Sequence, residues 1–315
     1  MRILVTGAAG FIGSSLCQRL LSLGHTVTGL DCLTNYYSRA IKQGNIEACL
    51  LSDRFTFVEE DLLRADLAEL LADVDAVFHE AAQPGVRGSW GQQFEVYTDN
   101  NVLATQRLLE ACLHSSVSRF VNASSSSVYG NSPKVPTDEG SPTRPYSPYG
   151  VTKLAAEHLC SLYWQNHRLP AVSLRYFTVY GPRQRPDMAM NRFITRILRG
   201  EEISLYGDGM QERDFTYIDD AVDANISAMT SEGAIGRVFN IGGGSRVTVN
   251  QVLEILESTV GKRVRVVRSE RQAGDVDRTA ADTTLARELL DYRPSVPLEE
   301  GLPRQVAWHR EQSGR

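Results

Sequence analysis

A tyrosine and a lysine four residues apart are candidates for acid–base chemistry. Tyr149 and Lys153 follow Pro148, a residue favoured in the first turn of a helix, so the sequence predicts one helix face that carries both. A cation beside a phenol lowers the pKa of the phenol, which would let Tyr149 act as a general base near neutral pH. The pattern alone also fits a packed tyrosine beside a solvated lysine. The serine run 124–127 favours chemistry, because it follows a predicted strand, where ligands gather in parallel sheets.

A glycine-rich turn near the N-terminus predicts a dinucleotide site. The pattern G-x-x-G-x-x-G lies between a predicted strand and a predicted helix, which lets the backbone approach a pyrophosphate at the helix N-terminus. Asp31 ends the next predicted strand, where a carboxylate can accept both ribose hydroxyls and repel a 2′-phosphate, so NAD is favoured over NADP. The residues expected at the cofactor from this turn are Gly7, Gly10, Phe11, Ile12 and Gly13.

A third predicted strand is followed by Asp61 and Leu62, which we expect at the adenine. A solvated turn aspartate is the alternative for Asp61. The first half of the chain alternates strand-like runs with helical patterns, which implies a mostly parallel, doubly wound α/β sheet covered on both faces. The predicted strands are 3–5, 26–31, 54–59, 75–79, 119–123 and 171–177, and the predicted helices include 10–23 and the segment around 102–112.

The alternation of strands and helices becomes less regular after about residue 177. Loops are expected at 181–186, 207–209 and 242–244, a helix at 249–260 and a short strand at 263–268. We therefore expect a domain at 1–177, with some later segments packing back on it, and a smaller domain at 178–315.

Composition excludes several classes of function. The 315 residues include 33 Lys plus Arg and 38 Asp plus Glu, giving a net charge of −5 and a pI near 5.8. No basic field is available to hold nucleic acid or an anionic membrane surface. The chain has no run of 18 apolar residues and no signal-peptide core, so we expect a cytoplasmic protein. Five scattered cysteines without a CxxC pair indicate reduced thiols, and the six histidines form no metal motif, so no metal is expected.

Seven motifs spread along the chain resemble the extended short-chain dehydrogenase/reductases, specifically the nucleotide-sugar epimerases and dehydratases. The resemblance implies a Rossmann-type NAD domain and a smaller C-terminal α/β domain that holds the nucleotide sugar. It also implies a homodimer through two long helices, here starting near Phe94 and Tyr149, although helices packed on their own sheet would give much of the same pattern. The motifs are TGAAGFIG (6–13), FHEAA (78–82), NNVLAT (100–105), SSSSVYG (124–130), SPYGVTK (147–153), LRYFTVYGP (174–182) and RDFTYIDD (213–220).

The same resemblance implies roles for individual residues. Ser125, Tyr149 and Lys153 would be catalytic, with Tyr149 as proton acceptor and Lys153 also bonded to the nicotinamide ribose. Glu80 departs from the family, which usually has an apolar residue there, and His79 is expected to be a packed strand-end histidine. Further residues implied at the cofactor are Ala81, Ala82, Asn101 and Tyr176. Those implied at the substrate are Ser126, Phe177 and Thr178, with Arg213 and Asp275 at the nucleotide diphosphate and its ribose.

The reaction implied begins with oxidation of the sugar at C4. Related dehydratases carry Asp-Glu directly after the catalytic residue, and this chain has Ser126 and Ser127 instead. A serine hydroxyl does not titrate in the useful pH range, so these two residues cannot serve as the acid and the base that dehydration of the sugar needs. The sequence therefore favours a 4-epimerase, in which the 4-keto sugar turns over and is reduced on its other face.

Two loops, 178–189 and 81–87, resemble those of UDP-glucuronate 4-epimerases. A glucuronate carries a C6 carboxylate, which suits a forked guanidinium, and we expect Arg185 to bind it. Arg183 or Arg87 could share this role or bind phosphate, and an arginine could also simply stabilise its own loop. The expected conversion is UDP-glucuronate to UDP-galacturonate. Alternatives are a UDP-glucuronate decarboxylase and a 4-epimerase of UDP-glucose or UDP-N-acetylglucosamine. A non-enzymatic NAD sensor is disfavoured because Ser125, Tyr149 and Lys153 are all present.

Overall fold

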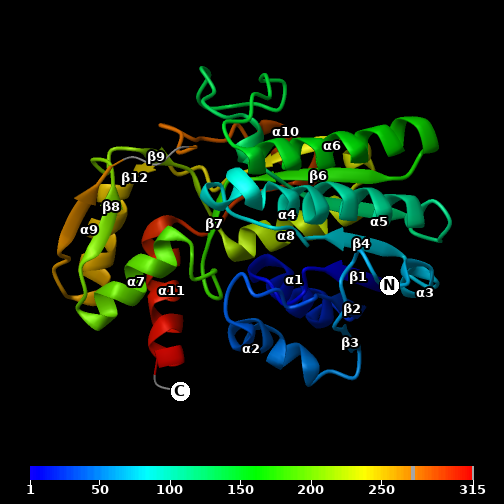
Figure 1. Cartoon of the computed structure of the whole chain (residues 1–315), viewed down its shortest axis with the longest axis horizontal. Coiled ribbons are helices and arrows are strands. Elements are labelled where there is room, and N and C mark those ends of the chain that lie inside the picture. Colours follow the sequence, from blue (N-terminus) through cyan, green and yellow to red (C-terminus); the bar gives the residue numbers. More distant parts are fainter. Residues whose placement is uncertain (271–273, 314–315) are drawn as a thin grey trace.

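A seven-stranded parallel sheet forms the centre of the protein (Figure 1). The structure is a computed structural model, and it describes residues 1–270 and 274–313. The first six strands have the order 3-2-1-4-5-6 of a doubly wound dinucleotide-binding sheet, so the fold expected from the sequence is confirmed. In sheet order the strands are β3 (Phe55–Val58), β2 (Thr26–Leu30), β1 (Arg2–Thr6), β4 (Ala76–His79), β5 (Arg119–Ser125), β6 (Ala171–Tyr176) and β11 (Val238–Ile241).

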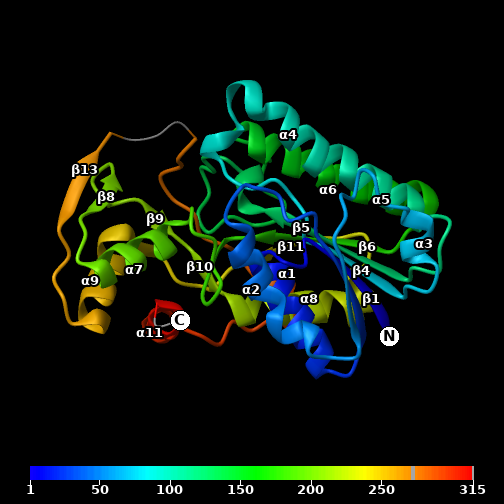
Figure 2. The same ribbon diagram turned by 60° about the horizontal axis from the view of Figure 1, so that its bottom comes forward.

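Helices cover both faces of this sheet (Figures 1 and 2). On one face lie α1 (Phe11–Ser22), α2 (Arg39–Leu50) and α8 (Ile218–Thr230). On the other lie α3 (Leu67–Leu71), α4 (Phe94–Thr98), α5 (Ala104–Cys112) and α6 (Pro148–His167). The central strands are buried on both faces. Polar residues inside them are paired, as where the Asn122 amide of β5 donates to the Ser173 hydroxyl of β6 at 3.1 Å.

Two features of the sheet differ from the sequence prediction. β5 continues to Ser125 rather than ending at Ala123, because Ser124 and Ser125 pair with Arg175 and Tyr176 of β6. The seventh strand, β11, was not predicted: it has four residues and pairs with a strand more than 60 positions earlier in the chain. The other five predicted strands occur within one residue or two of their expected bounds.

Smaller units follow residue 177. Among the described residues of this half, three small two-stranded sheets occur, together with α7 (Ala189–Arg199), α9 (Val249–Val260), α10 (Thr284–Leu290) and α11 (Leu298–Ser313). The bounds of α9 match the prediction, and a capping box between Thr248 and Gln251 explains its sharp start. The strand expected at 263–268 is found at 266–269. The pairs are β7 (Thr178–Tyr180) with β10 (Phe215–Tyr217), β8 (Ile203–Tyr206) with β13 (Val266–Ser269), and β9 (Glu212–Arg213) with β12 (Val247–Thr248).

Both β11 and α8 come from the second half of the chain, yet they complete the seven-stranded sheet and the helical layer on one of its faces. β11 pairs along β6, and α8 packs on α1. The division into 1–177 and 178–315 stays a prediction, with these elements as the later segments that return to the first unit.

The start of α6 is determined by local sequence. The Ser147 hydroxyl accepts a hydrogen bond from the Gly150 amide at 3.1 Å, and Pro148 occupies the first turn, as predicted for a helix carrying Tyr149 and Lys153. The helix ends where Arg168 adopts a left-handed conformation.

A buried ion pair ties α6 to the sheet. Arg175 of β6 donates to both carboxylate oxygens of Glu157, at 2.9 and 2.5 Å, and both side chains are about 5% exposed. The Ser124 hydroxyl donates to the same carboxylate at 2.8 Å, and Arg175 also donates to the Tyr129 hydroxyl at 2.6 Å. Glu157 therefore joins β5, β6 and α6.

Replacing Arg175 with Met should strongly destabilise the protein, because Glu157 would remain buried without its partner. We expect a loss of about 3–5 kcal/mol in the free energy of unfolding, measured by denaturant titration. The control is Arg304→Ala, which breaks an exposed pair with Glu300 and should cost about 0–1 kcal/mol. Equal losses in the two variants would contradict a structural role for the buried pair.

Candidate active site

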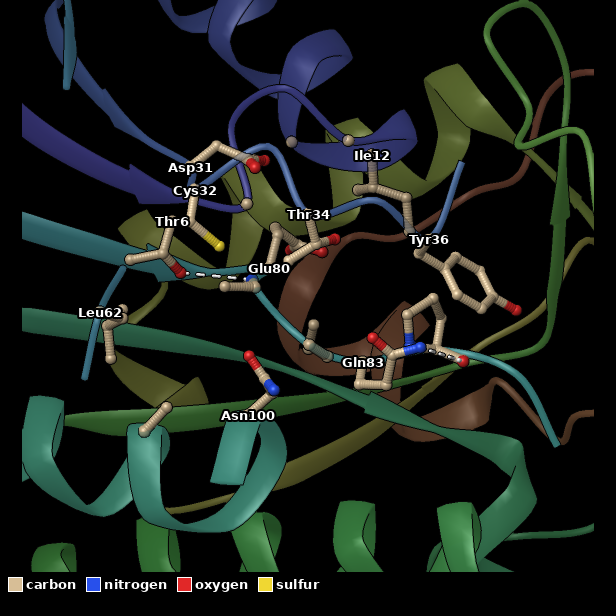
Figure 3. Close-up of a pocket in the computed structure, with 18 of the residues that line it drawn as sticks. Thr6, Ile12, Asp31, Cys32, Thr34, Tyr36, Leu62, Glu80, Gln83 and Asn100 are labelled. Carbon is tan, nitrogen blue, oxygen red and sulfur yellow. Dashed lines mark hydrogen bonds between the residues drawn. The ribbon is translucent and has the colours of Figure 1, made fainter. Parts of the chain in front are cut away.

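A cleft runs along the carboxyl ends of the central strands, and the glycine-rich turn forms one wall of it (Figure 3). Gly7 has a φ of +69°, and a Cβ there would lie 2.7 Å from the Ala81 amide nitrogen. A Cβ on Gly13 would lie 2.2 Å from the Gly7 carbonyl oxygen. Only glycine allows this close packing, which leaves the backbone and the start of α1 open to the cleft. The arrangement fits a dinucleotide pyrophosphate.

Asp31 lies at the end of β2 and lines the same cleft. Its carboxylate accepts hydrogen bonds from the amides of Ala9 (3.1 Å) and Leu33 (2.8 Å). Burial raises the pKa of Asp31, while these bonds and the nearby Lys42 charge oppose that rise. Lys42 donates to the Thr34 carbonyl and hydroxyl oxygens, at 2.8 and 2.9 Å. The carboxylate is thus held in place where the sequence predicts a ribose contact.

Most residues predicted at the cofactor line this cleft. They are Gly7, Gly10, Phe11, Ile12, Gly13, Asp31, Asp61, Leu62, Ala81, Ala82, Tyr149, Lys153 and Tyr176. Asn101 is not among them, although its neighbour Asn100 is. Asn101 instead accepts from the Gln83 amide at 2.7 Å and donates to the Thr152 hydroxyl at 3.0 Å. It lies in a π-helical turn between α4 and α5, and it joins the loop after β4 to α6.

Sequence reasoning missed several lining residues. Cys32, Thr34, Tyr36, Tyr37 and Lys42 come from the segment that follows β2 and the first turn of α2. Their signal was available, because this segment begins at the carboxyl end of a strand beside the glycine-rich turn. Thr6, Glu80, Gln83, Pro84, Asn100 and Ser124 also line the cleft.

The predicted catalytic side chains come together at one end of the cleft. Tyr149 and Lys153 line it, and the Lys153 ammonium donates to the Ala123 carbonyl oxygen at 2.6 Å. The Ser125 hydroxyl is hydrogen-bonded to Tyr149 and also accepts from the Ser127 amide at 3.1 Å. The last residues of β5 and the first turn of α6 therefore bring the serine, phenol and ammonium together.

Electrostatics at this end differ from the sequence expectation. The sequence predicts that Lys153 lowers the pKa of Tyr149, but burial raises that pKa, and the Arg185 charge and the Ser125 hydrogen bond are what oppose the rise. The Lys153 ammonium is directed to a backbone carbonyl instead. Burial lowers the pKa of Lys153 to about 8. Arg185 is therefore the cation that opposes the rise in the Tyr149 pKa, and the role predicted for Lys153 stays a prediction.

Arg185 lines the cleft, and one edge of its guanidinium is already hydrogen-bonded within the protein. Its Nε and Nη2 atoms donate to the two carboxylate oxygens of Asp187, each at 3.0 Å. The Tyr36 hydroxyl donates to the same carboxylate at 3.2 Å. In the described ranges 1–270 and 274–313, Nη1 has no hydrogen-bond partner, so a second edge of the guanidinium is available to an anion.

The other two candidate arginines point elsewhere. Arg183 donates to Gln18 of α1 at 2.7 Å, and it does not line the cleft. Arg87 pairs with Asp275 at 2.8 Å and lies over the Tyr206 ring. Two residues predicted to contact substrate therefore contact each other.

The remaining predicted substrate residues are spread around this second cluster and the end of β6. Arg213 donates to the carbonyl oxygens of Val276 at 2.8 Å and Asp277 at 3.3 Å. Thr178 begins β7, Ser126 begins a short 3₁₀ turn after β5, and Phe177 is buried against Tyr129. Their substrate contacts stay predictions.

His79 is a packed strand-end histidine, as expected. Its ring nitrogens contact the hydroxyls of Thr6 (2.8 Å) and Thr105 (2.9 Å), and burial lowers its pKa to about 3. No group of three or more His, Cys, Asp or Glu side chains suited to a metal occurs among the residues described. Likewise, no helix in that part of the chain is long and apolar enough to cross a membrane.

Comparison with known proteins agrees with this geometry. Residues 3–242 match the NAD dependent epimerase/dehydratase family. The chain belongs to this family. A Bacillus subtilis family member described as an uncharacterized UDP-glucose epimerase, YtcB, is 47% identical over 309 residues and 98% of each chain. A UDP-glucuronate 4-epimerase of Thermodesulfobacterium geofontis is 39% identical, over 98% of this chain and 96% of the relative.

The crystal structure of a family member, the UDP-glucuronic acid 4-epimerase of Bacillus cereus in complex with UDP-glucuronic acid and NAD, also matches. Its TM-score is 0.97 at 45% identity, over 99% of this chain and all of that one. The extended short-chain dehydrogenase/reductase fold expected from the motifs is thus confirmed over nearly the whole chain.

A glycine in α6 controls how closely the proposed base approaches the serine turn. A Cβ on Gly150 would lie 2.6 Å from the Ser127 carbonyl oxygen. We expect Gly150→Ala to push α6 away from the turn, lowering the unfolding temperature and weakening NAD binding.

The matched control is Gly44→Ala in α2, where a Cβ would meet nothing within 4 Å. Alanine is the better helix former, so this variant should gain about 0.5–1 kcal/mol of stability. A Gly150→Ala protein stabilised to the same extent would show that the close approach imposes no constraint.

Proposed function

We propose that this protein is an NAD-dependent UDP-glucuronate 4-epimerase, which interconverts UDP-glucuronate and UDP-galacturonate. The observation that carries the proposal is an arginine fixed by Asp187 beside the proposed base Tyr149, with one guanidinium edge left for the sugar carboxylate. The relatives from Thermodesulfobacterium geofontis and Bacillus cereus support the same substrate.

The glycine turn and Asp31 would hold NAD, which supplies reversible oxidation of the sugar at C4. The glycines leave room for the pyrophosphate, and the Asp31 carboxylate is positioned for the adenosine ribose. Asp31 would disfavour a 2′-phosphate at that place by charge repulsion.

Tyr149 would accept the proton of the C4 hydroxyl and later return it. The Ser125 hydroxyl, which is bonded to Tyr149, would share that proton and orient the sugar oxygen. The Lys153 ammonium, fixed by the Ala123 carbonyl, would contribute positive charge and a donor for the nicotinamide ribose. No further acid or base is needed, because the same tyrosine serves both directions.

Arg185 would hold the C6 carboxylate through its Nη1 side. Its Nε and Nη2 atoms stay on Asp187, so the guanidinium can serve two carboxylates at once. A neutral-sugar reaction on UDP-glucose is the second candidate, because the 47% identical relative carries that description. It would leave this arginine edge without an anionic partner.

We further propose that the protein is a cytoplasmic homodimer. Exposed apolar side chains on neighbouring helices α4 and α6, among them Phe94, Val96, Val151 and Leu162, support a helical dimer interface. The five cysteines form no disulfide, which is the usual state in the cytoplasm.

Tyr149→Phe should lose at least about a hundredfold in the rate of UDP-glucuronate epimerisation, because the ring is kept and only the proton acceptor is removed. The measurement is incubation with UDP-glucuronate, UDP-glucose and UDP-N-acetylglucosamine, with products identified by NMR. The protein should carry NAD as purified, since each turnover restores the cofactor. Turnover of only a neutral sugar by the wild type would refute the glucuronate assignment, and near-normal turnover by the variant would remove Tyr149 from the mechanism.

Arg185→Leu should lower activity in two separable ways. Loss of its charge should raise the pKa of Tyr149, which moves the rising limb of the pH–rate profile to higher pH for every sugar. Loss of the carboxylate contact should weaken UDP-glucuronate specifically, by about ten- to hundredfold in kcat/KM. The two effects are separated by comparing kcat/KM for UDP-glucuronate and for UDP-glucose at a pH above the shifted rising limb of the profile. A UDP-pentose by-product should also be sought.

Arg183→Leu is the matched control, because Arg183 lies in the same loop but contacts Gln18. We expect it to leave the preference between the two sugars unchanged. If Arg185→Leu weakens both sugars equally at high pH, the arginine does not recognise the carboxylate.

A further inference from the structure

A carboxylate that the proposed mechanism does not use faces the cleft beside the catalytic end. Glu80 directly follows β4, and strand alternation directs it away from His79. Its Oε1 atom accepts a hydrogen bond from the Tyr176 hydroxyl at 2.9 Å, and Asn225 of α8 donates to the same hydroxyl at 2.7 Å. Glu80 and Tyr176 both line the cleft with Tyr149 and Lys153. The side chain is thus held in place rather than free to turn to solvent.

Glu80 has no cation to neutralise it at close range. Within residues 1–270 and 274–313 it forms no ion pair. The nearby cation that opposes its protonation is Lys153, whose ammonium donates to the Ala123 carbonyl. Burial raises the pKa of Glu80 to about 7, against the opposing effects of Tyr176 and Lys153. The site would therefore be stabilised by a further positive charge in the cleft.

We propose that the Glu80 carboxylate stabilises the oxidised form of bound NAD relative to the reduced form. This inference rests on the proposed NAD-dependent function. The nicotinamide end must lie near Tyr149, because that residue acts on the sugar atom that is oxidised. The oxidised nicotinamide ring carries one positive charge that the reduced ring lacks, and a nearby anion in a partly desolvated cleft favours the charged ring.

The consequence concerns release of the intermediate. Each epimerisation removes a hydride, with its two electrons, from C4 of the sugar to the cofactor and then returns it, so the cofactor shows no net change. If the 4-keto sugar escapes, the enzyme is left with reduced cofactor and cannot start another cycle. A carboxylate that favours oxidised NAD makes return of the electrons to the sugar more favourable. Glu80 would therefore reduce the accumulation of this inactive form.

The test is Glu80→Gln, which removes the charge and keeps the shape. Cofactor-stripped protein is titrated with NAD⁺ and with NADH at neutral pH, and the ratio of the two dissociation constants is compared with that of the wild type. We expect the variant to shift this ratio by about tenfold towards NADH. The variant purified with its own cofactor should also show a larger dihydronicotinamide absorption.

Two variants separate charge from structure. Tyr176→Phe removes the hydrogen bond that lowers the Glu80 pKa, so it should shift the ratio in the same direction by a smaller factor, and it serves if Glu80→Gln fails to fold. Glu139→Gln is the control, because this carboxylate accepts from the Asn240 amide and does not line the cleft. Its ratio should equal that of the wild type.

An unchanged ratio in folded Glu80→Gln, or in Tyr176→Phe if the first variant cannot be purified, would overturn the inference. Wild-type protein that binds NAD but turns over no UDP-sugar would refute the proposed function while leaving this ratio measurable. Wild-type protein that binds neither NAD⁺ nor NADH would refute both.

Discussion

The buried ion pair between Glu157 and Arg175 is the interaction on which the geometry of the cleft depends. The Glu157 carboxylate lies inside the protein and accepts hydrogen bonds from Arg175 of β6 and from Ser124 of β5, while its own backbone belongs to α6. Lys153 lies one turn earlier on the same helix. Because a buried charge is stable only when it is fully paired, these three elements have one favourable arrangement. This polar contact therefore ties the middle of α6, one turn beyond Lys153, to the ends of β5 and β6.

Each charged side chain in the cleft is also held by a neighbour, but that neighbour leaves some of its hydrogen-bonding groups unused. Asp187 occupies one edge of Arg185, a single backbone carbonyl holds the Lys153 ammonium, and one hydroxyl holds Glu80. The oxidised ring of NAD would meet Glu80 and a sugar carboxylate would meet Arg185, and each of these two side chains is only partly satisfied by its protein neighbour. Such preorganisation lowers the cost of binding, because few side chains must move.

Local patterns were sufficient to predict the sheet, the glycine turn and the helix that carries Tyr149 and Lys153. Those features follow from spacing within about ten residues and from capping residues such as Ser147. β11 could not be predicted, because four residues carry little periodicity and their pairing with β6 depends on the assembled sheet. The direction of Glu80 could have been inferred from strand alternation.

Side-chain pairing was beyond what the sequence could provide. The pairing of Arg185 with Asp187 was open to prediction as a short-range contact, but its support from Tyr36 joins residues 151 positions apart. Arg87 and Asp275 each matched a pattern of residues that contact substrate. Their ion pair joins two loops that lie 188 positions apart in the chain, so it depends on the tertiary fold. Residue type and spacing indicate what a side chain is able to do, whereas its partners depend on tertiary packing.

The position of β11 has a consequence for synthesis of the chain. β6 is complete at residue 176, but the strand that covers its outer edge ends at residue 241. While the intervening segment is being made, β6 is the edge of a six-stranded sheet, with unpaired amide and carbonyl groups facing outwards. Such edges are templates for pairing with other chains. The nascent protein therefore passes through a period in which its sheet still lacks this edge strand and is most exposed to aggregation, and that period ends only when residues 238–241 leave the ribosome.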